Sequence, residues 1–461
     1  MMMTVEFLSQ NVTQGKLASP HALDLETLYS VNATDVAQAV NELYANQHKE
    51  GAWSAWLNLP HRDAMWEAMT AFAQEVEGQF DDLVILGIGG SCLGGKTLLS
   101  ALLHPYWNNL TKEQRGGKPR YHFIDNVDSD QITGLLDVLD LSRTLVNVIT
   151  KSGTTAETMS AMMLFKEALQ SKLGADAVAK HMVVTTDANK GLLRQLAQQA
   201  QYRAFEVPDD VGGRFSVFCA VGLLPAALCG IDLQALRQGI LDLEPALKNP
   251  DVHQNPAAQS ALIHTSMYHK GYTQSVLMPY SARLYWVAHW YVQLWAESLG
   301  KKFNKEGQVV HVGATAIPAV GATDQHSQIQ LYNEGTFDKV ITFIEVSQTD
   351  HTLTIPATAY PEVAELSYLG GKTFHQLMLA ELDGTRTSLL KNDRPTLSLK
   401  IPRVDAYHVA QVLYFLEVQT ALAGAFFNVD PFDQPGVELA KKYTHALMGK
   451  TGYESLLAEL A

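Results

Sequence analysis

The sequence predicts an α/β protein built from two units that each contain a parallel sheet. The first observation is size, because 461 residues that are 47% hydrophobic exceed what one core of about 250–300 residues holds. The second is that short apolar runs alternate with helical stretches, the pattern of βαβ units. The third is that this alternation occurs twice, beginning at "LVILGI" (residue 83) and again at "QSVLMPY" (residue 274).

Each unit contains four predicted strands. In the first unit they are "LVILGI" at 83, "YHFI" at 121, "TLVNVIT" at 144 and "HMVVTT" at 181, and in the second "QSVLMPY" at 274, "HVGATAI" at 311, "DKVITFIEV" at 338 and "TLSLKI" at 396. Before them, Trp53, Trp56 and Trp66 recur at near-helical spacing, which predicts a mainly helical lead-in. After Pro435 the sequence predicts one terminal helix.

Composition excludes several classes of function. A formal charge of -14 disfavours nucleic acid as a partner, and any anionic ligand needs a local cluster of cations. The strongly apolar stretch 217–229 is too short to span a bilayer, and the N-terminus has no signal-peptide pattern, so we expect neither membrane insertion nor export. Cys92, Cys219 and Cys229 form no metal motif and predict reduced thiols in the cytoplasm.

Two loops that follow predicted strands have the composition of a phosphate site. "GIGGSCLGG" follows the strand at 83, and "TKSGTTAET" (residues 150–158) follows the strand at 144. Open α/β sheets bind ligands in loops at the carboxyl ends of their strands, where helix N-termini offer N–H groups to anions. The second loop adds hydroxyls and Lys151 as donors. The alternative for this loop is a simple Ser/Thr helix cap, with Glu157 in the first turn.

From Gly90 onward the first loop also fits G-x-x-x-x-G-K-[ST], the P-loop pattern of nucleotide triphosphatases. That pattern closes on Lys96 and Thr97. A P-loop does not require the second hydroxyl-rich loop, whereas a shared site for one phosphate does. We therefore treat nucleotide hydrolysis as a minor alternative. If the loop is not a P-loop, Lys96 is an ordinary residue early in a helix.

Charged and polar residues in two further stretches are candidates for catalysis. In "DDVGGRFS", Arg214 follows two glycines, so that a permanent bidentate charge stands where the backbone can approach a ligand; the alternative is a structural salt bridge. The stretch 281–302 predicts an amphipathic helix on which Gln293 and Glu297 share a stripe among tryptophans. A carboxylate in such surroundings suits a general base; the alternative is a solvated pair between Glu297 and Lys301.

Two later stretches complete the set. "GATDQHS" places His326 among polar residues after a loop, where an imidazole can titrate, although a structural histidine is the commoner case. In "FDQPGVELAKK", Gln434 and Lys441 lie on one face of a predicted helix, so an amide and an ammonium can point at one ligand. A surface pair between Glu438 and Lys441 is the alternative.

Taken together, these stretches resemble the glucose-6-phosphate isomerase (phosphoglucose isomerase) family, in its short bacterial type. The resemblance covers about residues 50–450 and rests on six motifs in the family's order: "GIGGSCLGG", "TKSGTTAET", "VGGRFSVF", "QLWAESLGK", "GATDQHS" and "FDQPGVELAKK". Many relatives have Ser at the position of Thr150 and Thr at that of Ser152. Hydroxyls are retained, so we expect the same cradle.

The resemblance implies an α/β fold of two sugar-isomerase (SIS-like) αβα sandwich domains with parallel sheets, a helical lead-in and a C-terminal helix. The implied ranges are 1–75 for the lead-in, 76–230 for the first domain, 265–430 for the second, and 431–461 for the helix that completes the active site. The family acts as a homodimer, without metal or cofactor, and places its histidine in the partner's site.

The resemblance also implies roles for individual residues. Glu297 resembles the base that moves the proton between C2 and C1, Arg214 the group that stabilises the enediolate, and His326 and Lys441 the pair that opens the sugar ring. The implied substrate contacts are Gly90, Ser91, Thr150, Lys151, Ser152, Thr155, Glu157, Gly213, Gln293 and Gln434. The implied reaction interconverts glucose 6-phosphate and fructose 6-phosphate; a non-catalytic sugar-phosphate sensor on the same fold is the alternative.

Overall fold

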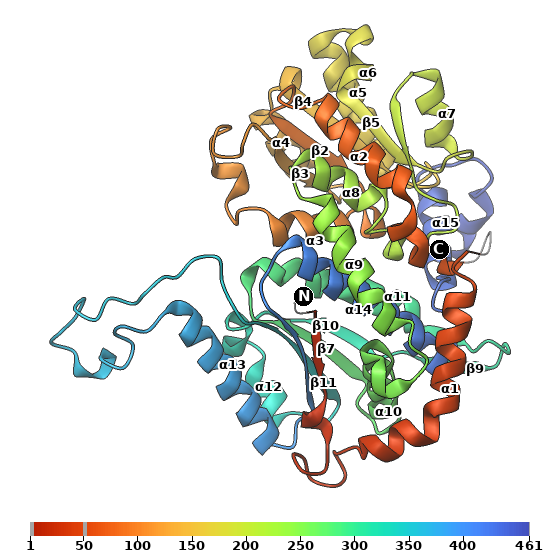
Figure 1. Cartoon of the computed structure of the whole chain (residues 1–461). Coiled ribbons are helices and arrows are strands. Elements are labelled where there is room, and N and C mark those ends of the chain that lie inside the picture. The colour runs from red at the N-terminus through yellow and green to blue at the C-terminus, as the bar shows by residue number, and fades with distance from the viewer. Residues whose placement is uncertain (1–3, 49–52, 461) are drawn as a thin grey trace.

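The computed structural model describes residues 4–48 and 53–460, which form two five-stranded sheets with helices between and around them (Figure 1). The first sheet has the order β3-β2-β4-β5-β6, and all its strands are parallel. Its strands are β2 (Asp82–Leu86), β3 (Arg120–Ile124), β4 (Thr144–Ile149), β5 (Met182–Thr186) and β6 (Arg203–Glu206). The fold class predicted from the sequence is confirmed.

The second sheet has the order β1-β12-β11-β7-β10. Four strands are parallel, and β1 pairs with β12 in the antiparallel direction. The strands are β1 (Glu6–Leu8), β7 (Gln274–Pro279), β10 (Thr315–Pro318), β11 (Lys339–Val346) and β12 (Thr396–Ile401). The predicted lead-in is therefore not only helical, because its first residues add an edge strand to the second sheet.

Helices cover both faces of each sheet. In β2, for example, successive side chains point to opposite faces of the sheet. Leu83 and Ile85 belong to the core shared by the two sheets, and Val84 and Leu86 belong to a separate core on the other face. Strands buried on both faces read as continuous apolar runs. The shared core also contains Leu399 of the second sheet, so the sheets pack through one layer of inner helices (Figure 1).

The inner helices that contribute to the shared core are α1 (Leu25–Ala45), α2 (Asp63–Glu75), α3 (Leu93–Leu102), α8 (Ala220–Leu228), α9 (Leu233–Leu247), α10 (Pro256–His269), α11 (Tyr285–Leu299) and α14 (Ala406–Phe426). Outside the first sheet lie α4 (Ser129–Val138), α5 (Ala156–Leu173), α6 (Val178–His181) and α7 (Leu192–Gln199). Outside the second lie α12 (Ile329–Glu334) and α13 (Phe374–Lys391). All strands of the first sheet, and those of the second sheet except β1, fall inside the predicted domain ranges, whose bounds stay a prediction.

Two predicted elements differ from those in the structure. The run "HVGATAI" forms two strands, because Gly313 turns the chain with φ +129° between β9 (Val309–Val312) and β10. β9 pairs with β8 (Lys301–Phe303) in a separate hairpin, and only β10 joins the sheet. The terminal helix α15 (Glu438–Leu447) ends before Gly449, where φ is +73°, and a short 3-10 turn (Glu454–Glu459) follows.

Among the described residues, α14 is the helix long and apolar enough to cross a membrane, with mean hydropathy 1.3 over its window. That window is 89% buried inside the fold. A core helix that is hydrophobic on all sides is typical of a large α/β protein. The length and composition of α14 are thus explained by its packing.

Both sheets have the same switch point in their strand order. In the first sheet β2 lies between β3 and β4, and in the second β7 lies between β10 and β11, which are the next two strands of that sheet in sequence. The switch therefore lies between β2 and β4 and between β7 and β11. Loops at the carboxyl ends of such strand pairs leave in opposite directions and form a crevice, the place where open α/β sheets bind ligands.

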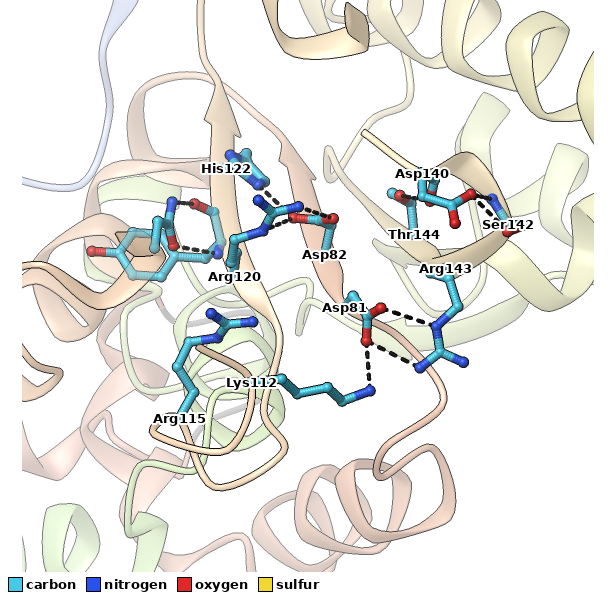
Figure 2. Close-up of polar contacts among 12 residues, drawn as sticks. Asp81, Asp82, Lys112, Arg115, Arg120, His122, Asp140, Ser142, Arg143 and Thr144 are labelled. Carbon is cyan, nitrogen blue, oxygen red and sulfur yellow. Dashed lines mark hydrogen bonds and ion pairs between the residues drawn. The ribbon is translucent and has the colours of Figure 1, made fainter. Parts of the chain in front are cut away.

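Ion pairs connect the amino ends of strands in the first sheet, at the side away from the crevice (Figure 2). The fully buried carboxylate of Asp82 accepts from Arg120 at 2.8 and 2.7 Å and from Nε2 of His122 at 2.8 Å. Asp81 pairs with Arg143, which with a neighbouring lysine lowers the pKa of Asp81 to about 2. These contacts join the starts of β2, β3 and β4 and keep the strand ends at the crevice in register.

Candidate active site

Two loops at the carboxyl edge of the first sheet form the centre of the candidate site. The loop after β2 contains a 3-10 turn (Gly89–Ser91) and leads into α3, and the loop after β4 leads into α5. β2 and β4 are neighbouring parallel strands, so both loops leave the sheet at its switch point. Of the predicted substrate contacts, the structure brings six to these two loops: Gly90, Ser91, Thr150, Lys151, Ser152 and Thr155.

Glycines in the first loop allow two close approaches of the backbone. A Cβ on Gly90 would lie 2.3 Å from the carbonyl carbon of Gly213, so this loop packs directly on the turn that carries Arg214. A Cβ on Gly89, whose φ is +58°, would lie 3.0 Å from Nε2 of Gln293. Side chains at these positions would push the loops apart, and the glycines thus bring the loop after β2, Arg214 and α11 together.

The hydroxyls of the second loop bond to one another. Thr150 Oγ1 lies 3.0 Å from Thr155 Oγ1 and accepts from the N–H of Gly153 at 3.3 Å. Ser152 Oγ lies 2.8 Å from Thr154 Oγ1. Thr155 occupies the N-cap position of α5, yet its side chain makes no capping hydrogen bond. The simple cap considered as an alternative is therefore not what these hydroxyls form.

Lys151 joins the second loop to the segment before Arg214. Its Nζ donates to the carbonyl oxygens of Asp209 at 2.7 Å and Val211 at 3.1 Å. Burial lowers the pKa of the Lys151 ammonium. The predicted contact with phosphate stays a prediction, and the geometry adds a second role, since this side chain fixes two loops relative to each other. Glu157 lies half-buried in the first turn of α5.

Arg214 is buried, with 4% of its surface exposed. Its guanidinium donates to Oγ of Ser298 (2.7 Å), Oε1 of Gln434 (2.8 Å), and the carbonyl oxygens of Pro431 (2.5 Å) and Asp433 (2.9 Å). Burial lowers its pKa, and the nearby carboxylate of Glu297 acts against that shift. Arg214 therefore holds three segments that are far apart in the sequence at one point.

Glu297 lies near the end of α11 and faces the same point. Its Oε2 lies 3.5 Å from Nη1 of Arg214, and its Oε1 accepts from Nε2 of Gln293 at 3.2 Å. The alternative partner, Lys301, pairs instead with Asp433 at 2.7 Å. The helix stripe predicted from the sequence thus presents an amide and a carboxylate to the crevice, with the carboxylate beside a buried cation.

The two remaining predicted catalytic residues lie on the surface of this chain. Lys441 on α15 pairs with Glu438 at 2.8 Å, and both side chains are more than half exposed, which matches the surface pair considered as the alternative. His326 is exposed in a 3-10 turn (Thr323–His326) that follows β10. Their roles in ring opening stay predictions.

The turn that carries His326 lies near the first half of α11. Burial lowers the pKa of His289 on α11, and the carboxylate of Asp324, two residues before His326, acts against that shift. His289 precedes Glu297 by two helical turns, or about 12 Å at the usual helical rise. The polar contacts of Glu297 in the described part of the chain are with Arg214 and Gln293, and none of them involves His326.

The P-loop alternative is not favoured by the position of Lys96. Its Nζ donates to Oδ2 of Asp125 at 2.6 Å and lies 4.4 Å from the centre of the Trp286 ring. In a P-loop this lysine reaches the phosphates and a strand-end aspartate serves Mg²⁺, whereas here the two side chains neutralise each other. No group of three or more His, Cys, Asp or Glu side chains in the described part of the chain is arranged to hold a metal ion.

The second sheet has an equivalent crevice with different side chains. A cavity of about 600 Å³ opens there between the loops that follow β7 and β11. Arg283 and Asp350, one from each loop, form an ion pair at 2.9 Å. An ion pair stands where the first crevice has glycines and hydroxyls, so the candidate phosphate site belongs to the first sheet.

Sequence reasoning missed Ser298, Pro431 and Asp433, which all hold Arg214. Ser298 follows Glu297 directly and is fully buried, but a serine near a helix end carries no signal of its own. Pro431 and Asp433 act through backbone carbonyls, so their residue types do not reveal the contact. Only the distance to Arg214 identifies them.

The doubled α/β fold, with a switch-point crevice that combines glycines, hydroxyls, a buried guanidinium and a carboxylate, places the protein in the sugar-isomerase class. The family model of phosphoglucose isomerase matches residues 62–457. The chain belongs to the phosphoglucose isomerase family, which confirms the resemblance carried by the six motifs.

Individual relatives agree with this membership. The chain is 43% identical to a glucose-6-phosphate isomerase of Carboxydothermus hydrogenoformans over 84% of its own length and 83% of the relative's. It is 36% identical to that of Symbiobacterium thermophilum over 96% of both chains. A solved structure of a hypothetical protein from Thermus thermophilus superposes with TM-score 0.87 at 34% identity, covering 97% of this chain and all of that one. A Chlamydia trachomatis glucose-6-phosphate isomerase, 22% identical, shares the fold with TM-score 0.79 over 98% of this chain and 95% of that one.

Proposed function

We propose that this protein interconverts D-glucose 6-phosphate and D-fructose 6-phosphate as an aldose–ketose isomerase. The observation that carries the proposal is the 3.5 Å approach of the Glu297 carboxylate to the buried Arg214 guanidinium, beside a loop of hydroxyls at a helix N-terminus. Proton abstraction next to a carbonyl needs one base and one fixed cation where the oxyanion develops. Family membership supports the same reaction.

The phosphate is bound by the second loop in this proposal. Thr150, Ser152 and Thr155 supply hydroxyls, and the backbone N–H groups at the start of α5 point in the direction that favours an anion. Gly90 and Ser91 bring the neighbouring loop to the same group. A formal charge of -14 on the chain makes such local donors necessary, because the overall field repels a phosphate.

The reaction follows from the other residues. After ring opening, assigned to His326 and Lys441, Glu297 takes the proton from C2 and returns it to C1. Arg214 lies beside the carboxylate and stabilises the enediolate oxygen that forms between the two steps. Gln293 hydrogen-bonds to Glu297 and Gln434 to Arg214 in this structure, which supports the proposal that both amides contact the substrate.

The active site is shared between two copies of the chain in this proposal. The contacts of Glu297 in this chain are with Arg214 and Gln293, and the family resemblance implies that the histidine at the reacting carbons comes from a partner subunit. Such an exchange is reciprocal in a symmetric dimer. We place the homodimer in the cytoplasm, because its three cysteines are free thiols and a reducing compartment keeps them so.

A coupled assay tests the proposed function. Purified protein is given fructose 6-phosphate with EDTA present, and glucose 6-phosphate is measured as it forms. Turnover under these conditions is the expected result. Binding of either sugar phosphate without turnover would instead support the non-catalytic sensor, and hydrolysis of ATP with Mg²⁺ would support the nucleotide triphosphatase.

Mixed dimers test the shared site. Glu297→Gln and His326→Ala variants are each expected to be weakly active, whereas a dimer with one subunit of each kind has one intact site and regains up to about half the wild-type activity. Mixing Glu297→Gln with Arg214→Lys is the control, because both residues belong to the same chain's site and no intact site forms. Recovery in neither mixture would show that His326 does not act in the partner's site.

A further inference from the structure

An ion pair between the buried Lys301 and the exposed Asp433 lies next to Arg214 and has no part in the reaction described above. Lys301, in β8 just after α11, has 7% of its surface exposed. Its Nζ lies 2.7 Å from Oδ1 of Asp433 and also donates to the backbone carbonyl oxygen of Asp433. Asp433 belongs to the segment that leads into α15, so this pair ties the C-terminal segment to the end of the helix that carries Glu297.

Two cations therefore meet at one carbonyl oxygen. The Asp433 carbonyl accepts from Nζ of Lys301 and, at 2.9 Å, from Nη2 of Arg214. The next residue, Gln434, accepts from Nη1 of Arg214 at 2.8 Å. The position of the Asp433 peptide thus fixes both nitrogens at the end of the Arg214 guanidinium, and Lys301 fixes the Asp433 peptide.

The energetics of this arrangement favour positioning over stability. Burying the ammonium of Lys301 is costly, so its ion pair is weak evidence of net stabilisation. The Asp433 side chain is 54% exposed, so removal of Lys301 leaves a carboxylate that water can solvate. The pair holds the Asp433 backbone carbonyl in a fixed position next to the guanidinium of Arg214.

We propose that Lys301 and Asp433 form a positioning pair, which holds Arg214 and Gln434 where the enediolate oxygen develops. Among the described residues, no hydrogen bond or ion pair joins Arg214 to the side chain of Lys301 or Asp433, although the Asp433 charge acts to raise the pKa of Arg214; the direct contact is through the Asp433 carbonyl. The inference rests on the proposed isomerase function and adds two residues to it that the sequence motifs left without a role.

The experiment compares Lys301→Met with Lys302→Met. Lys302 is the adjacent residue and is exposed, so its change controls for loss of one positive charge. We expect Lys301→Met to lower kcat by about 10- to 100-fold, the effect of misplacing a catalytic group by about 1 Å. KM for fructose 6-phosphate should change little, because the phosphate loop lies elsewhere. Lys302→Met should match the wild type.

Two ligands separate positioning from a merely structural effect. Arabinonate 5-phosphate has a planar carboxylate in place of the enediolate, and glucitol 6-phosphate has the phosphate without the planar anion. The affinity of the protein for both ligands is measured by calorimetry. Lys301→Met is expected to weaken binding of arabinonate 5-phosphate by a factor close to its loss in kcat, and to leave binding of glucitol 6-phosphate unchanged. Equal weakening of both would overturn the proposal.

A double-mutant cycle completes the test. Asp433→Asn keeps the backbone carbonyl and is expected to lower kcat in part. Adding Lys301→Met to this variant should lower kcat by a smaller factor than Lys301→Met does in the wild type. Should Lys301→Met fail to fold, Asp433→Asn alone gives the same ligand comparison from a half-exposed position. Full activity in both variants would overturn the inference, whereas an inactive wild type would overturn the proposed function itself.

Discussion

Glu297→Gln is expected to abolish nearly all turnover while leaving substrate binding intact. Glutamine keeps the size of the side chain and can still accept from Gln293, but it has no basic carboxylate to take the C2 proton. Loss of a general base costs on the order of 10²–10⁴ in rate. Arg214 keeps four hydrogen bonds in the variant, so its thermal unfolding should be close to that of the wild type.

The measurement is exchange of the C2 hydrogen of glucose 6-phosphate with deuterated solvent, followed by NMR together with thermal melting. Wild-type protein should show exchange, made incomplete by direct transfer from C2 to C1. Glu67→Gln on the exposed side of α2 is the matched control and should behave as the wild type. Wild-type exchange in a folded Glu297→Gln variant would remove Glu297 from the mechanism, and Glu157 would be the next carboxylate to test.

Arg214→Lys is the second large effect we expect. Lysine keeps the positive charge, but one ammonium cannot donate along the divergent directions that now reach Ser298, Gln434 and two backbone carbonyls. Removing one donor from a developing oxyanion costs about 10²–10³ in kcat, and this change moves the cation and releases the C-terminal segment at once. We therefore expect a loss of at least that size.

The expected loss lies mainly in kcat, because the stabilised oxygen carries its charge only in the transition state and the intermediate. Steady-state kinetics with fructose 6-phosphate measures it. Arg203→Lys, at an exposed arginine of β6, is the control for the exchange of residue type. A variant with a raised KM and an unchanged kcat would show that Arg214 binds the ground state and does not act on the enediolate.

Much of the fold could be predicted from the sequence. The long buried strands are continuous apolar runs, and β2, β4, β5, β7, β11 and β12 lie at or within one or two residues of the predicted ones. The short strands β1, β6 and β8 escaped prediction, because three or four residues contain too little pattern to distinguish a strand from an extended loop. Their pairing is decided by the sheet edge or the strand they meet.

The sequence by itself determined the loops, the residue types in them and the family, since glycines, hydroxyls and helix starts are local features that fix local backbone geometry. The tertiary structure alone decided which of these residues meet. Arg214 reaches Ser298 across 84 positions and Gln434 across 220, and Lys301 reaches Asp433 across 132. Such contacts depend on how two sheets and their shared helices pack, and packing is set by the whole core and not by any one segment.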